Sequence, residues 1–176
     1  GKDFYIRQQG VSSEDKDSIG SVLNKIAAQK TRLGLIADVN QGVVSGCDYV
    51  SNRNVSDLDM SQDIALKDGI FVLDMKNSRD RAVYDTFNSE EKKFLRAFYK
   101  NSEIEKYYCN THNTKWLLYL NKAHLSIDAY PNLKHHMDRF MPVLSRRREA
   151  QSGVIKPFQL QWARTEEIFI KDKIVV

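Results

Sequence analysis

Carboxamide, hydroxyl and glycine residues are concentrated in one short segment, residues 40–46. The glycines allow the backbone to turn sharply or to approach a ligand closely. Carboxamide groups can form the paired hydrogen bonds that distinguish the edge of an adenine. The segment predicts a loop that contacts DNA, and its candidate residues are Asn40, Gln41, Gly42, Ser45 and Gly46. The alternative interpretation is a plain β-hairpin in which the glycines serve only the turn.

Basic residues are concentrated in two further segments. Three consecutive arginines follow a predicted amphipathic helix, and because successive helical side chains point in different directions, only one or two of them can reach the same phosphate. Residues 99–108 interleave lysines with tyrosines, which suits a sugar-phosphate backbone. The candidates for DNA contacts are Arg146, Arg147 and Arg148 in the first segment, and Tyr99, Lys100 and Ser102 in the second. The alternatives are a solvated charged face and buried tyrosines.

Catalytic patterns are weak. Asp63, Asp74 and Lys76 have the Asp…Asp-x-Lys spacing of magnesium-dependent nucleases. Such an enzyme needs both carboxylates at neighbouring strand ends around the metal ion, and no predicted strand leads into Asp63. A zinc site is a further alternative, but only one pair of its ligands is well spaced among Cys109, His112, His135 and His136. We therefore predict no catalytic and no metal-binding residue in this chain, and we keep the small nuclease as an alternative.

Composition sets the class of protein. The 176 residues, 41% hydrophobic and 28% charged, are typical of one globular domain with or without a small lobe. No apolar run is long enough for a membrane span, and the first residues do not resemble a signal peptide. Cys47 and Cys109 are the only cysteines, which favours a reducing compartment and a cytoplasmic location without a membrane partner. The net charge of +4 and the pI of about 9.0 are compatible with nucleic acid.

Hydrophobic spacing predicts three helices. The first runs from Ser12 or Ser13 to about residue 30, with a buried stripe formed by Ile19, Val22, Leu23 and Ile26. The second runs over residues 89–99 after a capping signal at Asn88 or Ser89. The third begins at Pro131 and is broken near Met141 by Pro142.

Apolar runs between polar turns predict the strands, at residues 4–7, 33–39, 47–51, 69–73, 116–120, 158–162 and 168–176. Residues 52–68 and 77–85 are expected to be connections, the first with a short helix. The fold class is therefore α+β, with mixed, mostly antiparallel sheets and several packed helices.

In order, these segments resemble the TaqI-like C-terminal specificity domain of adenine-specific DNA methyltransferases, including the bacterial type IIG restriction–modification enzymes. The resemblance covers about residue 33 to the C-terminus. It rests on Val39-Asn40-Gln41-Gly42-Val43-Val44-Ser45-Gly46, Gly69-Ile70-Phe71-Val72-Leu73, Phe98-Tyr99-Lys100-Asn101-Ser102-Glu103-Ile104, Trp116-Leu117-Leu118-Tyr119, Tyr130-Pro131-Asn132-Leu133, Arg146-Arg147-Arg148-Glu149, Gln159-Leu160-Gln161-Trp162-Ala163-Arg164, and Phe169 with Lys173-Ile174.

The resemblance implies a target recognition domain that binds double-stranded DNA sequence-specifically, and it adds Arg164 to the candidate contacts. Residues 1–32 would lead to a methyltransferase domain of the same parent chain, and residues 33–176 would be the recognition domain, shortened at its C-terminus. The Asn-Pro-Pro-Tyr motif and a glycine-rich S-adenosylmethionine loop are absent from this sequence. We therefore expect no enzyme activity and no cofactor in this chain. S-adenosylmethionine, and magnesium where the parent also cleaves DNA, are expected for the parent enzyme. The alternatives are the small nuclease and a protein-interaction module.

Overall fold

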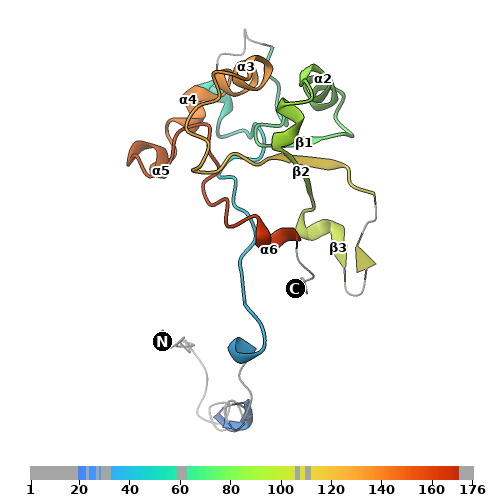
Figure 1. Cartoon of the computed structure of the whole chain (residues 1–176), viewed down its shortest axis with the longest axis vertical. Coiled ribbons are helices and arrows are strands. Elements are labelled where there is room, and N and C mark those ends of the chain that lie inside the picture. The colour runs from blue at the N-terminus through green and yellow to red at the C-terminus, as the bar shows by residue number, and fades with distance from the viewer. Residues whose placement is uncertain are drawn as a thin grey trace. The chain divides into compact units, whose positions relative to one another are not determined.

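The computed structural model describes residues 20–22, 24–26, 28, 33–58, 63–105, 108–109 and 112–170. Its contacts divide the chain into two compact units, Gly1–Gln41 and Gly42–Val176. The first unit contains helical turns at residues 20–22 and 24–26 and the 3₁₀ helix Leu33–Leu35. The second unit contains the sheets, the remaining helices and the hydrophobic core, and is drawn from cyan to red in Figure 1.

Two predictions for the first unit are wrong. Residues 33–39 are not a buried strand, because they begin with a 3₁₀ helix and leave Leu35, Ile36 and Val39 at least 72% exposed. A strand is stable only when a neighbour pairs with its backbone, and none pairs with this segment among the described residues. Val22 and Ile26 are also exposed, so they do not form a buried helical stripe. The predicted strand at residues 4–7, the helix cap, Ile19 and Leu23 lie outside the described residues.

The main sheet of the second unit has three antiparallel strands in the order β1 (Val72–Asp74), β5 (Lys115–Leu118) and β2 (Leu95–Phe98). Val72 pairs with Leu117 on one side of β5, and Leu95 pairs with Leu118 on the other. A two-stranded sheet joins β3 (Ile104–Glu105) to β4 (Tyr108–Cys109). The predicted strands near residues 69–73 and 116–120 are thus confirmed with shifted ends, and the α+β class is confirmed.

The segment predicted as a helix at residues 89–99 is instead a short 3₁₀ helix, Glu91–Phe94, followed by β2. The capping signal is real: Asn88 Oδ1 accepts from the amides of Glu90 and Glu91, and Glu91 Oε2 accepts from Asn88 N, all at 2.9 Å. The helix ends after one turn because the next residues pair with β5. Tertiary pairing here overrides the local preference for a helix.

The connection predicted at residues 77–85 is wrong, because Ser78–Thr86 form helix α2. Asn77 caps it by accepting from Arg79 N, the usual role of an N-terminal asparagine. The helix has no apolar stripe, which is why hydrophobic spacing did not reveal it. It is anchored instead by Asp80, which is 2% exposed and accepts from the amides of Gly69 and Asp74 at 2.8 Å.

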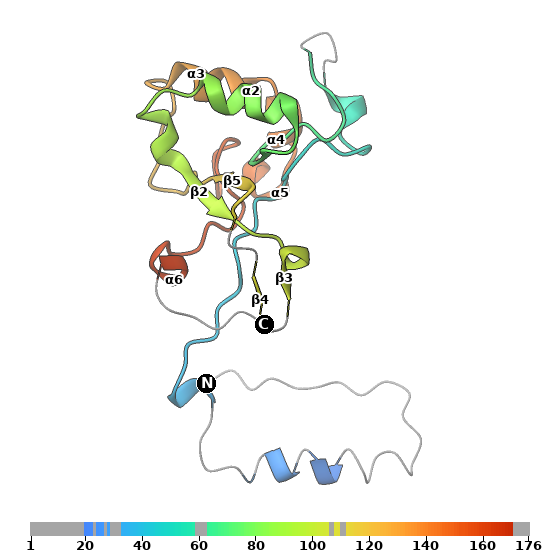
Figure 2. The ribbon, with the colours of Figure 1, turned by 90° about the vertical axis from the view of Figure 1, so that its right-hand side faces the viewer.

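Helix α3 (Pro131–Asp138) starts at the predicted proline, and α4 (Met141–Leu144) follows the predicted break. Figure 2 shows α2 and α3 side by side, on the opposite side of the main sheet from α6. Two further short helices are α5 (Arg148–Gln151) and α6 (Glu167–Ile170). The strand predicted over residues 168–176 is therefore wrong at residues 168–170, and its remainder lies outside the described residues. The 3₁₀ helix Val55–Asp57 confirms a short helix in the connection 52–68, and Asn101–Glu103 form another.

Two other predicted strands, at residues 47–51 and 158–162, remain only as isolated bridges. Tyr49 pairs with Gly69, and Val44 pairs with Trp162. Their backbone groups are partly taken up elsewhere: Asp48 O alone accepts from the amides of residues 70, 71 and 72, at 2.9 to 3.2 Å. The first of these bridges joins Tyr49 to the segment that precedes β1, and the second joins the beginning of the second unit to its C-terminal part.

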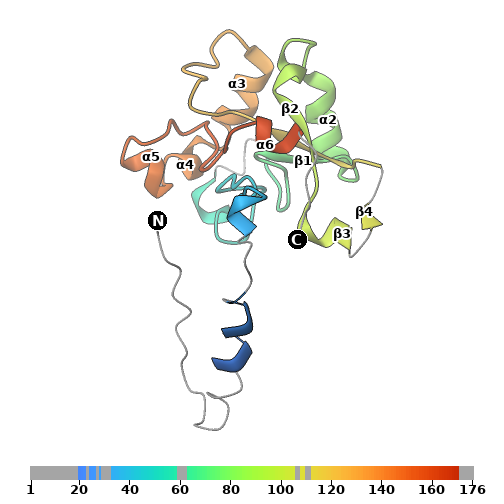
Figure 3. The same ribbon diagram turned by 60° about the horizontal axis from the view of Figure 1, so that its bottom comes forward.

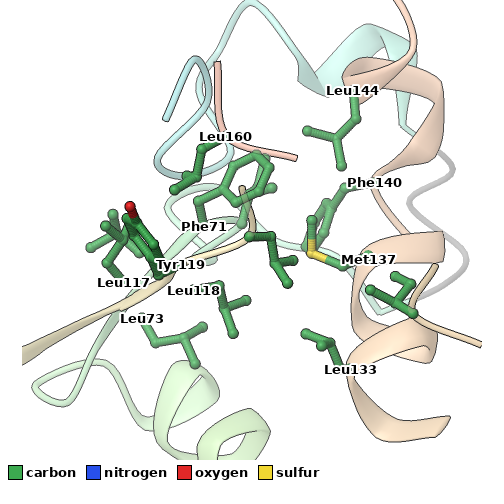
Figure 4. Close-up of a cluster of buried hydrophobic side chains, with 14 of the residues drawn as sticks. Phe71, Leu73, Leu117, Leu118, Tyr119, Leu133, Met137, Phe140, Leu144 and Leu160 are labelled. Atoms are coloured by element: carbon green, nitrogen blue, oxygen red, sulfur yellow. The ribbon is translucent and has the colours of Figure 1, made fainter. Parts of the chain in front are cut away.

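The hydrophobic core lies between the main sheet and helices α3 and α4 (Figure 4). Phe71 just before β1, Leu118 from β5, Met137 and Phe140 from the α3 region, and Leu144 from α4 are fully buried. Each fully buried side chain of this size stabilises the fold by about 1.5–3 kcal/mol. The core therefore holds the sheet and the helices of the second unit together.

Candidate nucleic-acid interface

The second half of the predicted DNA loop is part of the protein framework. Ser45 is 6% exposed, and its hydroxyl donates to Asp48 Oδ1 at 2.5 Å and accepts from Cys47 N at 3.2 Å. Gly46 has φ = +82°, and a Cβ there would lie 2.7 Å from Gln161 Oε1. Glycine is therefore required at this position for the turn and for the close neighbour. Ser45 and Gly46 shape the loop rather than present groups to a ligand.

Arg147 explains how this loop is held. Its Nη1 donates to Ser45 O at 2.8 Å, and its Nη2 donates to the carbonyls of Pro157 and Gln159 at 2.6 and 2.7 Å. Nε donates to Leu144 O at 3.2 Å, and the guanidinium lies over the ring of Phe71. Burial lowers the pKa of Arg147, although Cys47 and Glu149 act in the opposite direction. One arginine thus joins four chain segments, and its donors are directed to carbonyls inside the protein.

The other two consecutive arginines have different surroundings. Arg146 lies in the turn after α4, exposed, in an ion pair with Asp57. Arg148 is the first residue of α5 and is exposed. Successive residues at a helix junction point in different directions, so the run does not form one cationic cluster.

Two pairs of basic and aromatic side chains lie at the surface of the second unit. Lys100 Nζ lies 4.9 Å from the centre of the Tyr49 ring and 3.0 Å from Asp48 Oδ2. Arg164 Cζ lies 5.4 Å from the ring of Trp162. Tyr49 and Trp162 are 46% and 48% exposed, so nearly half of each aromatic side chain faces solvent. We call these four residues the aromatic–basic surface.

The backbone holds both pairs close to the same loop. Val44 exchanges two hydrogen bonds with Trp162, at 2.9 and 3.0 Å, and Tyr49 is only five residues further along. Five extended residues span at most about 18 Å. Tyr119 OH donates to Arg164 O at 2.8 Å and fixes the backbone at that residue, which has φ = 60°. Sequence reasoning identified Lys100 and Arg164 but missed Tyr49 and Trp162. Only their positions in the sequence could have indicated them, since Tyr49 follows the candidate loop and Trp162 lies two residues before Arg164.

Of the remaining candidate DNA contacts, three lie in the second unit and two lie in the first. Tyr99 is half-buried and Ser102 is exposed on the 3₁₀ helix 101–103. Gly42 is exposed, with open space where a Cβ would be, so nothing in the structure requires a glycine there. Asn40 and Gln41 are exposed at the end of the first unit. The structure thus brings Ser45, Gly46 and Arg147 into contact, and places Lys100 and Arg164 at the surface.

The residues of the alternative nuclease have separate partners. Asp63 is paired with Arg79 at 3.1 Å, whereas Asp74 lies 3.5 Å from Lys115 at the end of β1. In the described part of the chain, no group of three or more histidine, cysteine, aspartate and glutamate residues could hold a metal ion. Of the alternative zinc ligands, His136 is buried against Ile70 O. Within the same residues, no helix has the length and apolar character to cross a membrane.

Comparisons of the sequence with models of protein families and with curated proteins find no match.

Proposed function

We propose that the second unit is a target recognition module for double-stranded DNA, belonging to a restriction–modification enzyme or an adenine-specific DNA methyltransferase. The observation that supports this most is the aromatic–basic surface. Cations over exposed rings can shift to phosphate oxygens, while the rings contact sugars and bases. Lys100 and Arg164 supply the charge, and Tyr49 and Trp162 supply the rings.

The loop between Val44 and Tyr49 supports the proposal geometrically. Its Ser45 and Gly46 are fixed by Arg147 and Gln161, so the two aromatic residues flank a rigid turn. A rigid loop binds with a smaller loss of conformational entropy than a mobile one. Exposed Arg148 adds a third cation for phosphate contacts.

Binding of the full chain to random duplexes, followed by fluorescence anisotropy between about 50 and 200 mM salt, tests the DNA part of the proposal. Affinity should fall steeply with salt because bound phosphates release counterions. Replacing Lys100, Arg148 and Arg164 by alanine should reduce the salt slope by about one unit per lost contact. The matched control replaces three exposed basic residues outside this surface, Arg53, Arg81 and Lys122, and removes the same charge.

Equal losses in both triple variants would mean that only net charge matters and would remove both Arg148 and the aromatic–basic surface from the proposal. Sequence recognition is tested by selection from a random duplex pool, in which a recurring motif is expected. A pool that stays random after several rounds contradicts a recognition function. The parent enzyme is tested separately: an Asn-Pro-Pro-Tyr motif encoded in the same gene supports a methyltransferase, and a gene without one contradicts it.

A further inference from the structure

Helices α2 and α3, side by side in Figure 3, border a cleft of about 370 Å³ that is distinct from the aromatic–basic surface. Its lining includes Arg79 from α2, His136 and Arg139 from α3 and its C-terminal cap, and the loop residues Asp63 and Asp68. The cleft is therefore polar and carries charges of both signs.

Two guanidinium groups from opposite walls converge on one oxygen atom. Arg139 Nη2 donates to the main-chain oxygen of Asp63 at 2.8 Å, and Arg79 Nη2 donates to the same oxygen. Arg79 is neutralised by Asp68, at 2.8 and 3.1 Å, and by the Asp63 carboxylate. Arg139 has no carboxylate within ion-pair distance in the described ranges. The Arg139 guanidinium is therefore bonded at the cleft to a neutral carbonyl oxygen and not to a carboxylate.

Two buried polar atoms at this cleft lack hydrogen-bond partners: Arg139 Nε, a donor, and His136 Nδ1. His136 is 3% exposed, and its Nε2 lies 2.9 Å from Ile70 O. A carbonyl oxygen only accepts, so Nε2 carries the hydrogen and Nδ1 is an acceptor. The two atoms belong to residues three positions apart, which are neighbours on a helical surface. Buried polar groups are rarely left unpaired, and a bound group that both accepts and donates would satisfy this donor and this acceptor.

Asp63 occupies the point where the guanidinium groups meet. It has φ = 55°, unusual for a residue with a side chain, and its side chain is 89% exposed. Its carbonyl and carboxylate oxygens accept hydrogen bonds from the two arginines, as the oxygens of a bound anion would. Asp63 can therefore be displaced from this position at little loss of buried surface.

We propose that this cleft binds a phosphate group that retains a P–OH, namely inorganic phosphate or a phosphate monoester, in competition with Asp63. Guanidinium groups bind phosphate oxygens with paired hydrogen bonds. The remaining P–OH donates to His136 Nδ1. A carboxylate, a sulfate and the phosphodiester of DNA have no such hydrogen, so the site discriminates against all three.

The test is isothermal titration of the full chain with sodium phosphate at pH 6.5, compared with sodium sulfate and sodium acetate at equal ionic strength. Phosphate should bind at least tenfold more tightly than either. A second arm compares an oligonucleotide bearing a 5′-phosphate with its 5′-hydroxyl form. If the 5′-phosphorylated oligonucleotide binds more tightly than inorganic phosphate, the ligand is a nucleic-acid terminus. If inorganic phosphate binds more tightly, the ligand is free phosphate.

Three variants locate the site. Asp63→Asn keeps the carbonyl, tolerates a positive φ and removes the competing charge, so phosphate affinity should rise several-fold. Arg139→Gln should lower it at least tenfold. Arg81→Gln removes one charge from the same helix α2 at a residue outside the cleft and should change nothing.

Sulfate binding as strong as phosphate binding, or no heat with phosphate, would overturn the proposal. So would unchanged affinity in Arg139→Gln with a native circular dichroism spectrum. If Arg139→Gln does not fold, the Asp63→Asn result decides: unchanged or weaker phosphate affinity rejects the site. None of these outcomes depends on duplex binding at the aromatic–basic surface.

Discussion

Three consecutive arginines of identical chemistry have three different surroundings in this protein. Arg146 is paired with Asp57 at the surface, Arg147 is bonded to four backbone carbonyls, and Arg148 is exposed on α5. A run of like charges in a sequence therefore does not by itself predict one phosphate-binding cluster. The difference arises because the backbone changes from the turn after α4 to the start of α5 within this run.

We predict that Arg147→Ala lowers the free energy of unfolding by about 3 kcal/mol, because it leaves buried carbonyl groups without donors. Arg148→Ala, the matched control, should change it by less than about 0.5 kcal/mol. Urea unfolding followed by circular dichroism measures both. Similar small effects in the two variants would show that the carbonyls near Arg147 find other partners, and would return Arg147 to the candidates for DNA contact.

At the scale of secondary-structure elements, α3 depends on a neutral histidine. His136 lies edge-on to Phe87 and Phe140, and its Nε2 bonds Ile70 O. Burial lowers the pKa of His136 from 6.5 to about 4, although the hydrogen bond to Ile70 acts in the opposite direction. The folded protein thus binds fewer protons than the unfolded chain between these pH values. This contribution to stability is complete above about pH 6.5 and declines as the pH falls towards 4.

We therefore predict that the unfolding free energy decreases by up to about 3 kcal/mol through this group over that range. Thermal or urea unfolding at several pH values measures it. His136→Phe should be less stable at pH 7, since Ile70 O loses its donor, but its stability should change less between about pH 6.5 and 5. His135→Gln, an exposed neighbour on the same helix, should keep the wild-type slope. A wild-type slope in His136→Phe would contradict the assignment.

The elements that sequence reasoning predicted correctly are those in which local and tertiary signals agree. Residues 116–120 form a continuous apolar run that becomes the central strand β5, and Pro131 marks the start of α3. The errors occur where residues far away in the sequence determine the secondary structure. Residues 95–98 are a strand because β5 lies beside them, and α2 is held by the buried carboxylate of Asp80. Neither partner can be read from the spacing of apolar residues.

The candidate site shows the same limit. Loop composition indicated the region of residues 40–46, but the spacing could not show that Ser45 and Gly46 support the loop while Tyr49 and Trp162 are exposed beside it. The bridge between Val44 and Trp162 joins residues 118 positions apart in the chain. Such a contact depends on the whole fold, so one sequence does not reveal it.

At the scale of the whole molecule, the core belongs to one unit. Among the residues that the structure describes, every member of the hydrophobic cluster, from Val43 onward, lies in Gly42–Val176. In the described part of the first unit, Val22, Ile26, Leu35, Ile36 and Val39 are more than half exposed. In these described ranges, the burial of apolar side chains that stabilises the fold is therefore found in the second unit.

We predict that a chain starting at Gly42 unfolds cooperatively within about 4 °C of the full chain, a shift that corresponds to less than about 1 kcal/mol. Differential scanning calorimetry of both chains measures it.

The same shortened chain lacks Asn40 and Gln41, the two candidate DNA contacts outside the second unit, but keeps the aromatic–basic surface intact. If the loop amides read bases, sequence preference should weaken while the salt dependence of binding stays the same, because phosphate contacts are retained. Gln41→Ala in the full chain is the matched single change.

A large drop in the melting temperature of the shortened chain would instead show that residues 1–41 contribute to the stability of the fold. The boundary at Gly42 would then not separate two independently stable units.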